Sequence, residues 1–169
     1  MTTPRCVGRR VSVSSTASSN HLIGNWFRIH LASSSSKKSG GKALELKVIG
    51  EVKQKHGRTI LEIHEEFEAA LEGLTEGQWI ILLVWFHLNN TPELRRTLKV
   101  HPMGDRSRPL RGVFATRSPL RPNPIGKYTV KIRKFLNSRT IEIDPIDAFD
   151  STPIIDIKPF IKNLDCPPV

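Results

Sequence analysis

Cysteine is scarce in this sequence of 169 residues. The two cysteines, Cys6 and Cys166, lie near opposite ends of the chain, and neither belongs to a Cys-x-x-Cys pair or has a histidine nearby. This pattern argues against a disulfide framework and a zinc site, and it is typical of a reducing compartment.

Long apolar runs are also missing. The longest, Trp79–Phe86, is much shorter than the roughly 20 residues of a transmembrane helix.

The sequence also lacks the motifs of several common enzyme classes. It has no Gly-x-Gly-x-x-Gly after a predicted strand, no Walker loop and no Gly-x-Ser-x-Gly elbow. These absences exclude Rossmann, P-loop and α/β-hydrolase sites of the usual form. No His, Cys or Asp residues have the spacing of metal ligands, so we expect no metal.

Acidic residues are absent from residues 1–42, a segment that holds seven Lys or Arg residues and ten serines. Most of the net charge of +10 lies there, because residues 43–169 have 19 basic and 16 acidic side chains. We interpret residues 1–42 as a disordered basic extension that ends in the linker Ser33–Lys42, and residues 43–169 as one domain. We expect a cytoplasmic location, although such a composition is also typical of organelle transit peptides.

Alternating apolar residues predict a mainly β domain. Strands are expected at 44–52, 59–63, 78–88, 113–115, 128–135, 140–144 and 154–157. The spacing of apolar residues in His64–Leu74 predicts one short amphipathic helix, and the prolines from Pro92 to Pro124 exclude regular helix there. We expect Trp79–Phe86 to lie in the core. The combination predicts a small closed β-barrel with one short helix, unlike a Rossmann fold.

Charge is segregated within the domain. Between Leu94 and Lys134 the chain has twelve Lys or Arg residues and one acidic residue, whereas Thr140–Ile157 has five acidic and no basic residues. A basic stretch can be an ordinary solvated face. Prolines stiffen this one and hold its side chains outward at low entropic cost, which favours a phosphate-binding surface.

The segment Gly112–Gly126 reads GVFATRSPLRPNPIG and stands out from the rest. Two arginines, Arg117 and Arg121, lie four residues apart among three prolines, and the glycine at each end permits unusual backbone angles. Arginine forks bind carboxylates and phosphates with two parallel hydrogen bonds. The residue types therefore suggest an anion-binding loop.

This segment and Asp150–Phe160, which reads DSTPIIDIKPF, resemble the paired signatures of the TsaA-like (TrmO-type) family. The family patterns run close to GVFATRSPxRPNPIG and DGTPVxDIKPY. Trp85–His87 and Val100–Asp105 match the family in order and spacing, and the resemblance extends from about Ile49 to about Asp165. The chain is identified as a member from these motifs.

The resemblance implies a β-barrel that forms a homodimer, with a site for S-adenosylmethionine near the subunit interface. It implies methyl transfer to N6 of threonylcarbamoyladenosine beside the tRNA anticodon. The acceptor nitrogen must lose a proton in this reaction, and our candidate proton acceptors are Asp147 and Asp150. The implied cofactor contacts are His87, Leu88, Arg117, Lys127, Asp147, Ala148, Phe149 and Asp150. The implied substrate contacts are Arg121, Asn123 and Lys158.

Several residues also have a purely structural reading. Asn123 can hydrogen-bond its own turn, His87 can be a core residue, and Asp156 and Lys158 can form a structural pair. Arg117 can tie its loop to the acidic stretch.

The sequence departs from the family pattern in four places. Ser151 replaces a glycine, and Phe160 replaces a tyrosine. The loop Lys53–Arg58 is shorter than in bacterial members and lacks their Pro-Arg-Gln motif, and the additional C-terminal domain of longer members is missing. Two alternatives therefore stay open: a methyltransferase with a different acceptor, and a non-enzymatic basic RNA-binding module.

Overall fold

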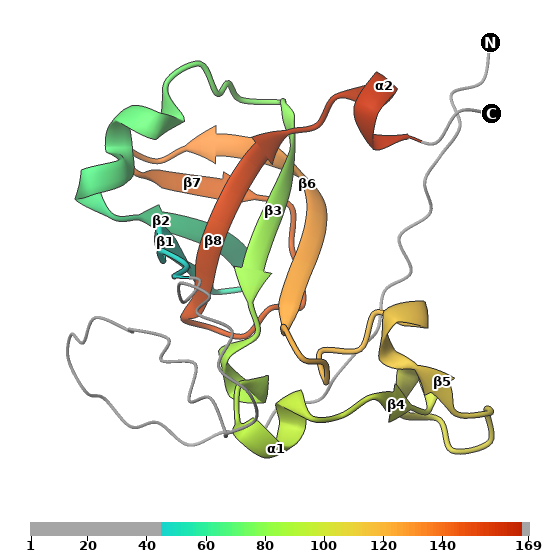
Figure 1. Ribbon diagram of the computed structural model, residues 1–169. Helices are drawn as coiled ribbons and strands as arrows, with labels where there is room; N and C mark the ends of the chain where they lie inside the picture. Colours follow the sequence, from blue (N-terminus) through green and yellow to red (C-terminus); the bar gives the residue numbers. More distant parts are fainter. Residues whose placement is uncertain (1–44, 167–169) are drawn as a thin grey trace, which may run out of the picture.

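The computed structural model describes residues 45–166, so the predicted disordered extension lies outside the described part. Six strands form a main sheet in which each strand pairs antiparallel with two neighbours. They are β1 (Gly50–Lys55), β2 (Arg58–Ile63), β3 (Trp79–Trp85), β6 (Ile125–Phe135), β7 (Thr140–Ile143) and β8 (Thr152–Pro159). The order is β1-β2-β7-β6-β3-β8, and β8 pairs again with β1, so the sheet closes as a barrel (Figure 1).

The mainly β prediction is confirmed, although the first strand begins later than expected. β1 begins at Gly50 rather than at Leu44. Residues 53–58 are not a loop, because β1 and β2 extend to a two-residue turn at His56 and Gly57. Both turn residues have positive φ, 50° and 76°, which matches the twist of a tight hairpin.

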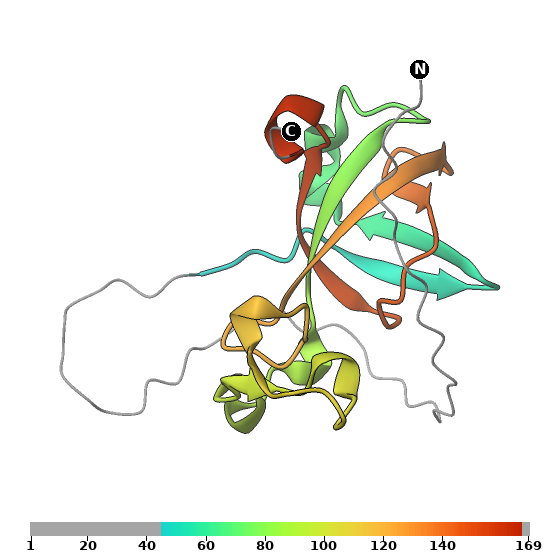
Figure 2. The same cartoon turned by 90° about the vertical axis from the view of Figure 1, so that its right-hand side faces the viewer.

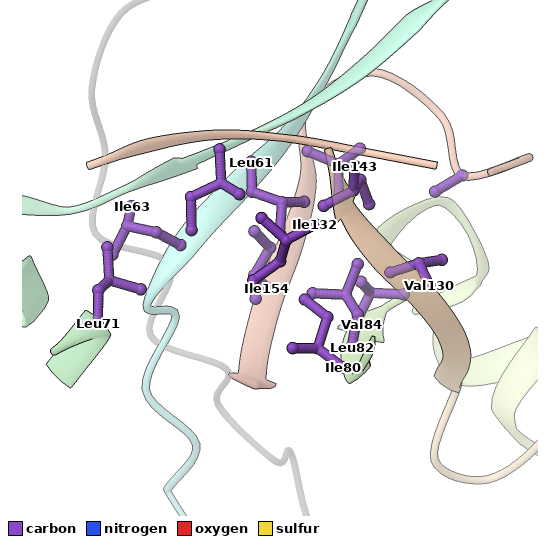
Figure 3. Packing of buried hydrophobic residues seen from close by; sticks show 13 residues of the cluster. Leu61, Ile63, Leu71, Ile80, Leu82, Val84, Val130, Ile132, Ile143 and Ile154 are labelled. Atoms are coloured by element: carbon purple, nitrogen blue, oxygen red, sulfur yellow. The ribbon is translucent and has the colours of Figure 1, made fainter. Parts of the chain in front are cut away.

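The interior of the sheet is filled by alternate apolar residues of all six strands (Figure 3). Ile80, Leu82 and Val84 of β3 are completely buried, as is Ile154 of β8. The expectation that the whole run 79–86 lies in the core is wrong for Trp79, which is 48% exposed because it sits where β3 begins. Five of the other six residues in β3 are buried, and Leu83 is partly exposed, so most of the strand and its ladders are shielded from water.

The predicted amphipathic helix is a 3-10 helix, η1 (Glu65–Leu71). Its hydrogen bonds join residues three apart, as from Phe67 N–H to His64 O and from Glu72 N–H to Ala69 O. The apolar face packs on the core as expected, since Leu71 is buried and Phe67 lies against the cluster. Apolar spacing predicted the buried face but did not distinguish the two helix types.

Residues 87–124 form a small lobe beside the sheet. It contains η2 (His87–Asn89), α1 (Pro92–Arg95), β4 (Lys99–Val100), η3 (Pro102–Gly104), β5 (Arg111–Gly112) and η4 (Val113–Ala115). Two views show it beyond the end of the sheet at which β3 ends and β6 begins (Figures 1 and 2). A further one-turn helix, α2 (Lys162–Asp165), follows β8. No helix among residues 45–166 is long and apolar enough to cross a membrane.

Two predictions for the lobe are wrong. Regular helix occurs in the proline-rich stretch, because α1 starts at Pro92, where a missing N–H costs nothing, and Thr91 Oγ1 accepts the Leu94 N–H at 3.3 Å. Val113–Ala115 is a 3-10 helix rather than a strand. The strand next to it is Arg111–Gly112, which pairs with β4.

The two glycines that frame the motif serve a different purpose from the expected one. Neither Gly112 nor Gly126 has positive φ. Gly126 is needed for space instead: a Cβ there would lie 2.4 Å from Phe86 Cζ and 2.8 Å from Val84 Cγ2. A Cβ on Gly112 would meet nothing within 4 Å. Gly126 therefore allows Phe86 to lie against the beginning of β6.

We expect Gly126→Ala to lower the free energy of unfolding by about 1–3 kcal/mol, because Phe86 and β6 must shift to admit the methyl group. Gly112→Ala is the matched control and should leave stability almost unchanged. Urea unfolding of the two variants checks this, and equal midpoints would contradict the close contact at Gly126.

Candidate functional site

The two motif segments of the sequence meet at one end of β3. Ile125, the first residue of β6, pairs with Trp85, and Ile154 near the start of β8 pairs with Val84. The end of β3 therefore lies between the beginnings of β6 and β8. The β7–β8 loop (residues 144–151) leads into β8 at this same end, so the acidic stretch and the proline-rich motif are brought together.

The β7–β8 loop is tied to the hairpin of β1 and β2. The Gln54 side-chain amide donates to Ile146 O at 3.2 Å and Ala148 O at 2.8 Å, and its backbone N–H donates to Asp150 Oδ1 at 2.8 Å. Thr59 Oγ1 donates to Gln54 Oε1 at 3.1 Å and accepts the Ile146 N–H at 3.3 Å. Sequence reasoning missed both residues, because neither belongs to a recognisable motif.

Asp147 is oriented by a tyrosine. The Tyr128 hydroxyl donates to Asp147 Oδ1 at 2.7 Å, and burial together with Asp147 raises the pKa of Tyr128 well above its usual range. Phe86 packs edge-on to Tyr128, with ring centroids 6.5 Å apart. Ala148 is buried, whereas Phe149 is 62% exposed. The predicted segment 147–150 thus presents one oriented carboxylate and one exposed aromatic ring.

Ser151 has a backbone conformation that favours glycine, with φ of 58°. This explains in physical terms why the family pattern has glycine at this position. The residue is held by its N–H, which donates to Val52 O at 2.7 Å. Its Oγ donates to Asp150 Oδ2 at 3.3 Å and accepts from Lys53 Nζ at 3.2 Å. These contacts offset part of the cost of the left-handed conformation.

His87, Leu88 and Lys127 lie where β3 ends and β6 begins. Burial lowers the pKa of His87, and the Glu51 carboxylate opposes this shift. His87 Nδ1 is buried and has no hydrogen-bond partner among the described residues. Leu88 is 56% exposed, and Lys127, which pairs with Leu83, is exposed as well. This end of the sheet therefore has a histidine ring nitrogen without a partner among the described residues, together with the exposed side chains of Leu88 and Lys127.

The two arginines of the motif have different surroundings. Arg121 Nη2 donates to Val113 O at 2.7 Å and Thr116 O at 2.8 Å, so its guanidinium braces the loop from inside. Arg117 is exposed and makes no hydrogen bond or ion pair within residues 45–166. Of the two, Arg117 is the one whose donors are available to an anion.

Arg95 holds the second half of this motif in place. Its Nε donates to Pro122 O at 2.7 Å and its Nη2 to Asn123 Oδ1 at 3.2 Å. The guanidinium also lies 5.7 Å from the centre of the Trp85 ring, which is almost completely buried. The sequence placed Arg95 in the basic stretch but gave no sign of this role. Asn123 therefore contacts a positioning arginine, and its predicted substrate contact stays a prediction.

Lys158 lies apart from the other predicted residues. It pairs with Ile81 in the middle of β3, and its Nζ contacts Asp156 Oδ2 at 2.7 Å. This hydrogen bond raises the pKa of Lys158. The structure therefore does not bring Lys158 together with Asp147–Asp150, and it shows the Asp156–Lys158 pair that the structural reading of these residues anticipates.

Most of the predicted cofactor contacts are exposed side chains. Two surface hollows of about 460 and 410 Å³ lie elsewhere on the described chain, and neither is lined by any predicted cofactor or substrate residue. Within residues 45–166 no group of three or more His, Cys, Asp or Glu side chains is placed to hold a metal ion.

Comparison with known families decides the classification. The model of the tRNA-methyltransferase O N-terminal domain matches residues 50–166, which is most of the described chain. The chain belongs to this family. The match confirms the resemblance inferred from the motifs, and it covers the hairpin, the lobe and the β7–β8 loop.

Two archaeal relatives match over most of their own length. A probable S-adenosyl-L-methionine-binding protein of Methanocaldococcus jannaschii is 60% identical over 124 residues, which cover 73% of this chain and 98% of that protein. A relative of the same description from Pyrococcus horikoshii is 52% identical over 126 residues, covering 75% and 89%. The mouse tRNA (adenine(37)-N6)-methyltransferase is 36% identical over 119 residues, covering 66% of this chain and 26% of that protein.

A solved structure shares the fold. TrmO from Pseudomonas aeruginosa superposes with a TM-score of 0.55 at 27% identity over 74% of this chain. The match spans 59% of the TrmO chain, so about two fifths of that protein has no counterpart in the superposition.

We expect Arg95→Lys to lower the free energy of unfolding by about 1–2 kcal/mol, because an ammonium cannot reproduce the fork that bonds both Pro122 and Asn123. The neighbouring Arg96 is exposed and provides the control Arg96→Lys, which should be neutral. Thermal unfolding of both variants tests this. A neutral Arg95→Lys would show that the motif does not depend on this arginine.

Proposed function

We propose that this protein transfers a methyl group from S-adenosylmethionine to N6 of threonylcarbamoyladenosine beside the anticodon of tRNA. The family match over residues 50–166 carries the proposal, because it includes both motif segments that meet at the end of β3. The relatives support the cofactor and the acceptor separately. Two are described as binding S-adenosylmethionine, and the mouse relative as a tRNA adenine-N6 methyltransferase.

The residues at the end of β3 fit the chemical groups of this cofactor. Arg117, whose donors have no partner within residues 45–166, suits its carboxylate, and the carboxylates of Asp147 and Asp150 suit its ammonium group and ribose hydroxyls. The buried His87 Nδ1 has no hydrogen-bond partner in the described part of the chain, so a ligand atom can bond to it, and the exposed Phe149 suits an adenine ring. When bound, the cofactor supplies an electrophilic methyl group on a sulfonium.

The chain itself must hold the acceptor in line and take up one proton. The carbamoyl substituent makes the N6 proton more acidic, so a carboxylate is an adequate acceptor. Asp147 is our first candidate, because Tyr128 occupies its Oδ1 and leaves Oδ2 to receive the proton. Asp150 is the second candidate, although both of its oxygens already have partners. Correct placement of donor and acceptor supplies the rest of the acceleration.

The lobe suits the phosphate backbone of tRNA. Its exposed basic residues without an ion pair among the described residues are Arg96, Lys99, Arg106, Arg111 and Arg117. Lobe residue Arg108 is paired with Asp105 at 3.1 Å. Each contact between such a side chain and a phosphate releases counterions, so binding should weaken steeply as salt rises.

The lobe also exposes apolar side chains that suit a second copy of the chain. Leu98, Met103, Leu110 and Phe114 are 65%, 71%, 56% and 83% exposed. Exposed apolar side chains of this size on a small lobe suit contact with another protein chain. A homodimer formed there would cover the exposed side of the site, so we propose that the partner subunit completes it.

A methyltransferase with another acceptor is the second candidate function. The two-residue turn at His56 and Gly57 favours it, because the bacterial Pro-Arg-Gln motif has no counterpart there. The third possibility is a basic RNA-binding module without a cofactor, and titration with S-adenosylmethionine distinguishes it from the two methyltransferases.

Calorimetric titration with S-adenosylmethionine should show saturable binding, and Arg117→Ala should weaken it about tenfold or more. Arg106→Ala is the control, because it removes an exposed lobe arginine outside the proposed pocket and should leave the Kd unchanged. A folded wild-type protein that does not bind the cofactor would contradict the proposal and favour the RNA-binding module.

Methyl transfer should be measured on tRNA with and without the threonylcarbamoyl group. We expect transfer only to the modified tRNA, and we expect Asp147→Asn to lower kcat about 100-fold, since the amide cannot accept the proton. Asp105→Asn in the lobe should retain normal kcat. Transfer to unmodified tRNA at the same rate would point to the other acceptor.

A further inference from the structure

Gln54 has no role in the proposed chemistry, yet it contacts the β7–β8 loop at three alternate residues. Its side chain bonds the carbonyl oxygens of Ile146 and Ala148, and its backbone N–H bonds the side chain of Asp150. The residues between these contacts, Asp147 and Phe149, are both exposed. The three hydrogen bonds fix alternate residues of the loop and leave Asp147 and Phe149 exposed to solvent.

We infer that Gln54, held by Thr59, is a positioning residue that fixes the β7–β8 loop in the conformation that binds cofactor and acceptor. The hydrogen bonds by themselves support the positioning of the loop, whereas the effect of Gln54 on cofactor binding rests on the proposed function. Gln54 acts through Asp147 and Asp150 and touches no reacting atom.

Only a side-chain amide can make this set of bonds. The Gln54 NH₂ group donates to two carbonyl oxygens while its oxygen accepts from the Thr59 hydroxyl. The Thr59 hydroxyl uses its one proton to donate a hydrogen bond to Gln54, so its oxygen accepts the hydrogen bond from the Ile146 N–H. Thr59 is 1% exposed, and losing a partner at such a buried site is costly.

The short hairpin explains how Gln54 reaches the loop. Gln54 and Thr59 are directly paired in the ladder of β1 and β2. The two-residue turn at His56 and Gly57 fixes this register, because a hairpin with this turn cannot slip by one residue without turning Gln54 to the other face. The hairpin that lacks the bacterial Pro-Arg-Gln motif thus supplies a contact of its own to the site.

The test compares Gln54→Glu with Gln78→Glu. Gln54→Glu replaces the NH₂ donor with a carboxylate oxygen that faces two carbonyl oxygens. Gln78→Glu is the same chemical change beside the start of β3, where the side chain only accepts a bond from Thr75 N–H at 3.1 Å. It therefore keeps its bond and serves as the control.

Tyr128, the only tyrosine of the chain, reports on the loop through its bond to Asp147. In the wild type its pKa is raised, so ultraviolet absorbance should show no ionisation near pH 10, where a free tyrosine ionises. Because the folded pKa is raised, this tyrosine stabilises the protein below about pH 10, and the contribution is lost as pH rises. Gln54→Glu should lower the pH at which Tyr128 ionises, because it removes the part of the shift due to Asp147 while the part due to burial remains, and Gln78→Glu should not change it.

The same proteins are titrated with S-adenosylmethionine. We expect Gln54→Glu to raise the Kd about tenfold or more, with no change for Gln78→Glu. An unmoved tyrosine titration in Gln54→Glu would overturn the positioning role. A moved titration with an unchanged Kd would overturn its link to the cofactor. Absence of binding by the wild type would contradict the proposed function and that link, and the tyrosine titration would still decide the positioning.

Discussion

The two hydrogen-bonded ladders of β3 are the constraint on which the site depends. β6 pairs along one side of β3 and β8 along the other, so two segments far apart in the sequence begin at the same end of one strand. The buried residues Ile80, Leu82 and Val84 hold this register. A slip by one residue would turn them outward and would move the motif away from the β7–β8 loop.

Polar contacts hold the loops of the site in place, as the apolar core holds the strands of the sheet. Gln54 and Thr59 fix the β7–β8 loop from the hairpin, and Arg95 fixes the proline-rich motif from the lobe. Both use side chains to satisfy backbone carbonyl groups that lie outside any sheet ladder. Ser151 differs from these residues, because its own backbone is in the left-handed conformation. Its hydrogen bonds offset part of the cost of that conformation, a cost that glycine would not have.

The sequence predicted the parts of the fold that depend on apolar alternation. The strands from β2 to β8 in the main sheet lie close to their predicted places, since period-two burial is visible in the residues themselves. Short elements were not predictable in this way. Val113–Ala115 has the composition of a strand but adopts a 3-10 turn, because the ladder partner of β4 is the preceding Arg111–Gly112.

The candidate site was predictable only where motifs exist. Arg117 and Asp147 are predicted from family position, whereas Gln54 and Arg95 make contacts between residues distant in the chain, which no local pattern encodes. Lys158 illustrates the reverse case. It belongs to a family motif, but the pairing of β8 with the middle of β3 places it away from the β7–β8 loop.

The proposed cofactor site lies where β3 ends and β6 and β8 begin. A crystal structure with S-adenosylhomocysteine, the demethylated product, tests it most directly. We expect a ligand that contacts His87, Arg117 and the Asp147–Asp150 segment, with lobe residues of a second copy covering its exposed side. A ligand bound instead in the polar hollow beside Glu51 and Arg139, or one that leaves Arg117 and Asp147 untouched, would contradict it.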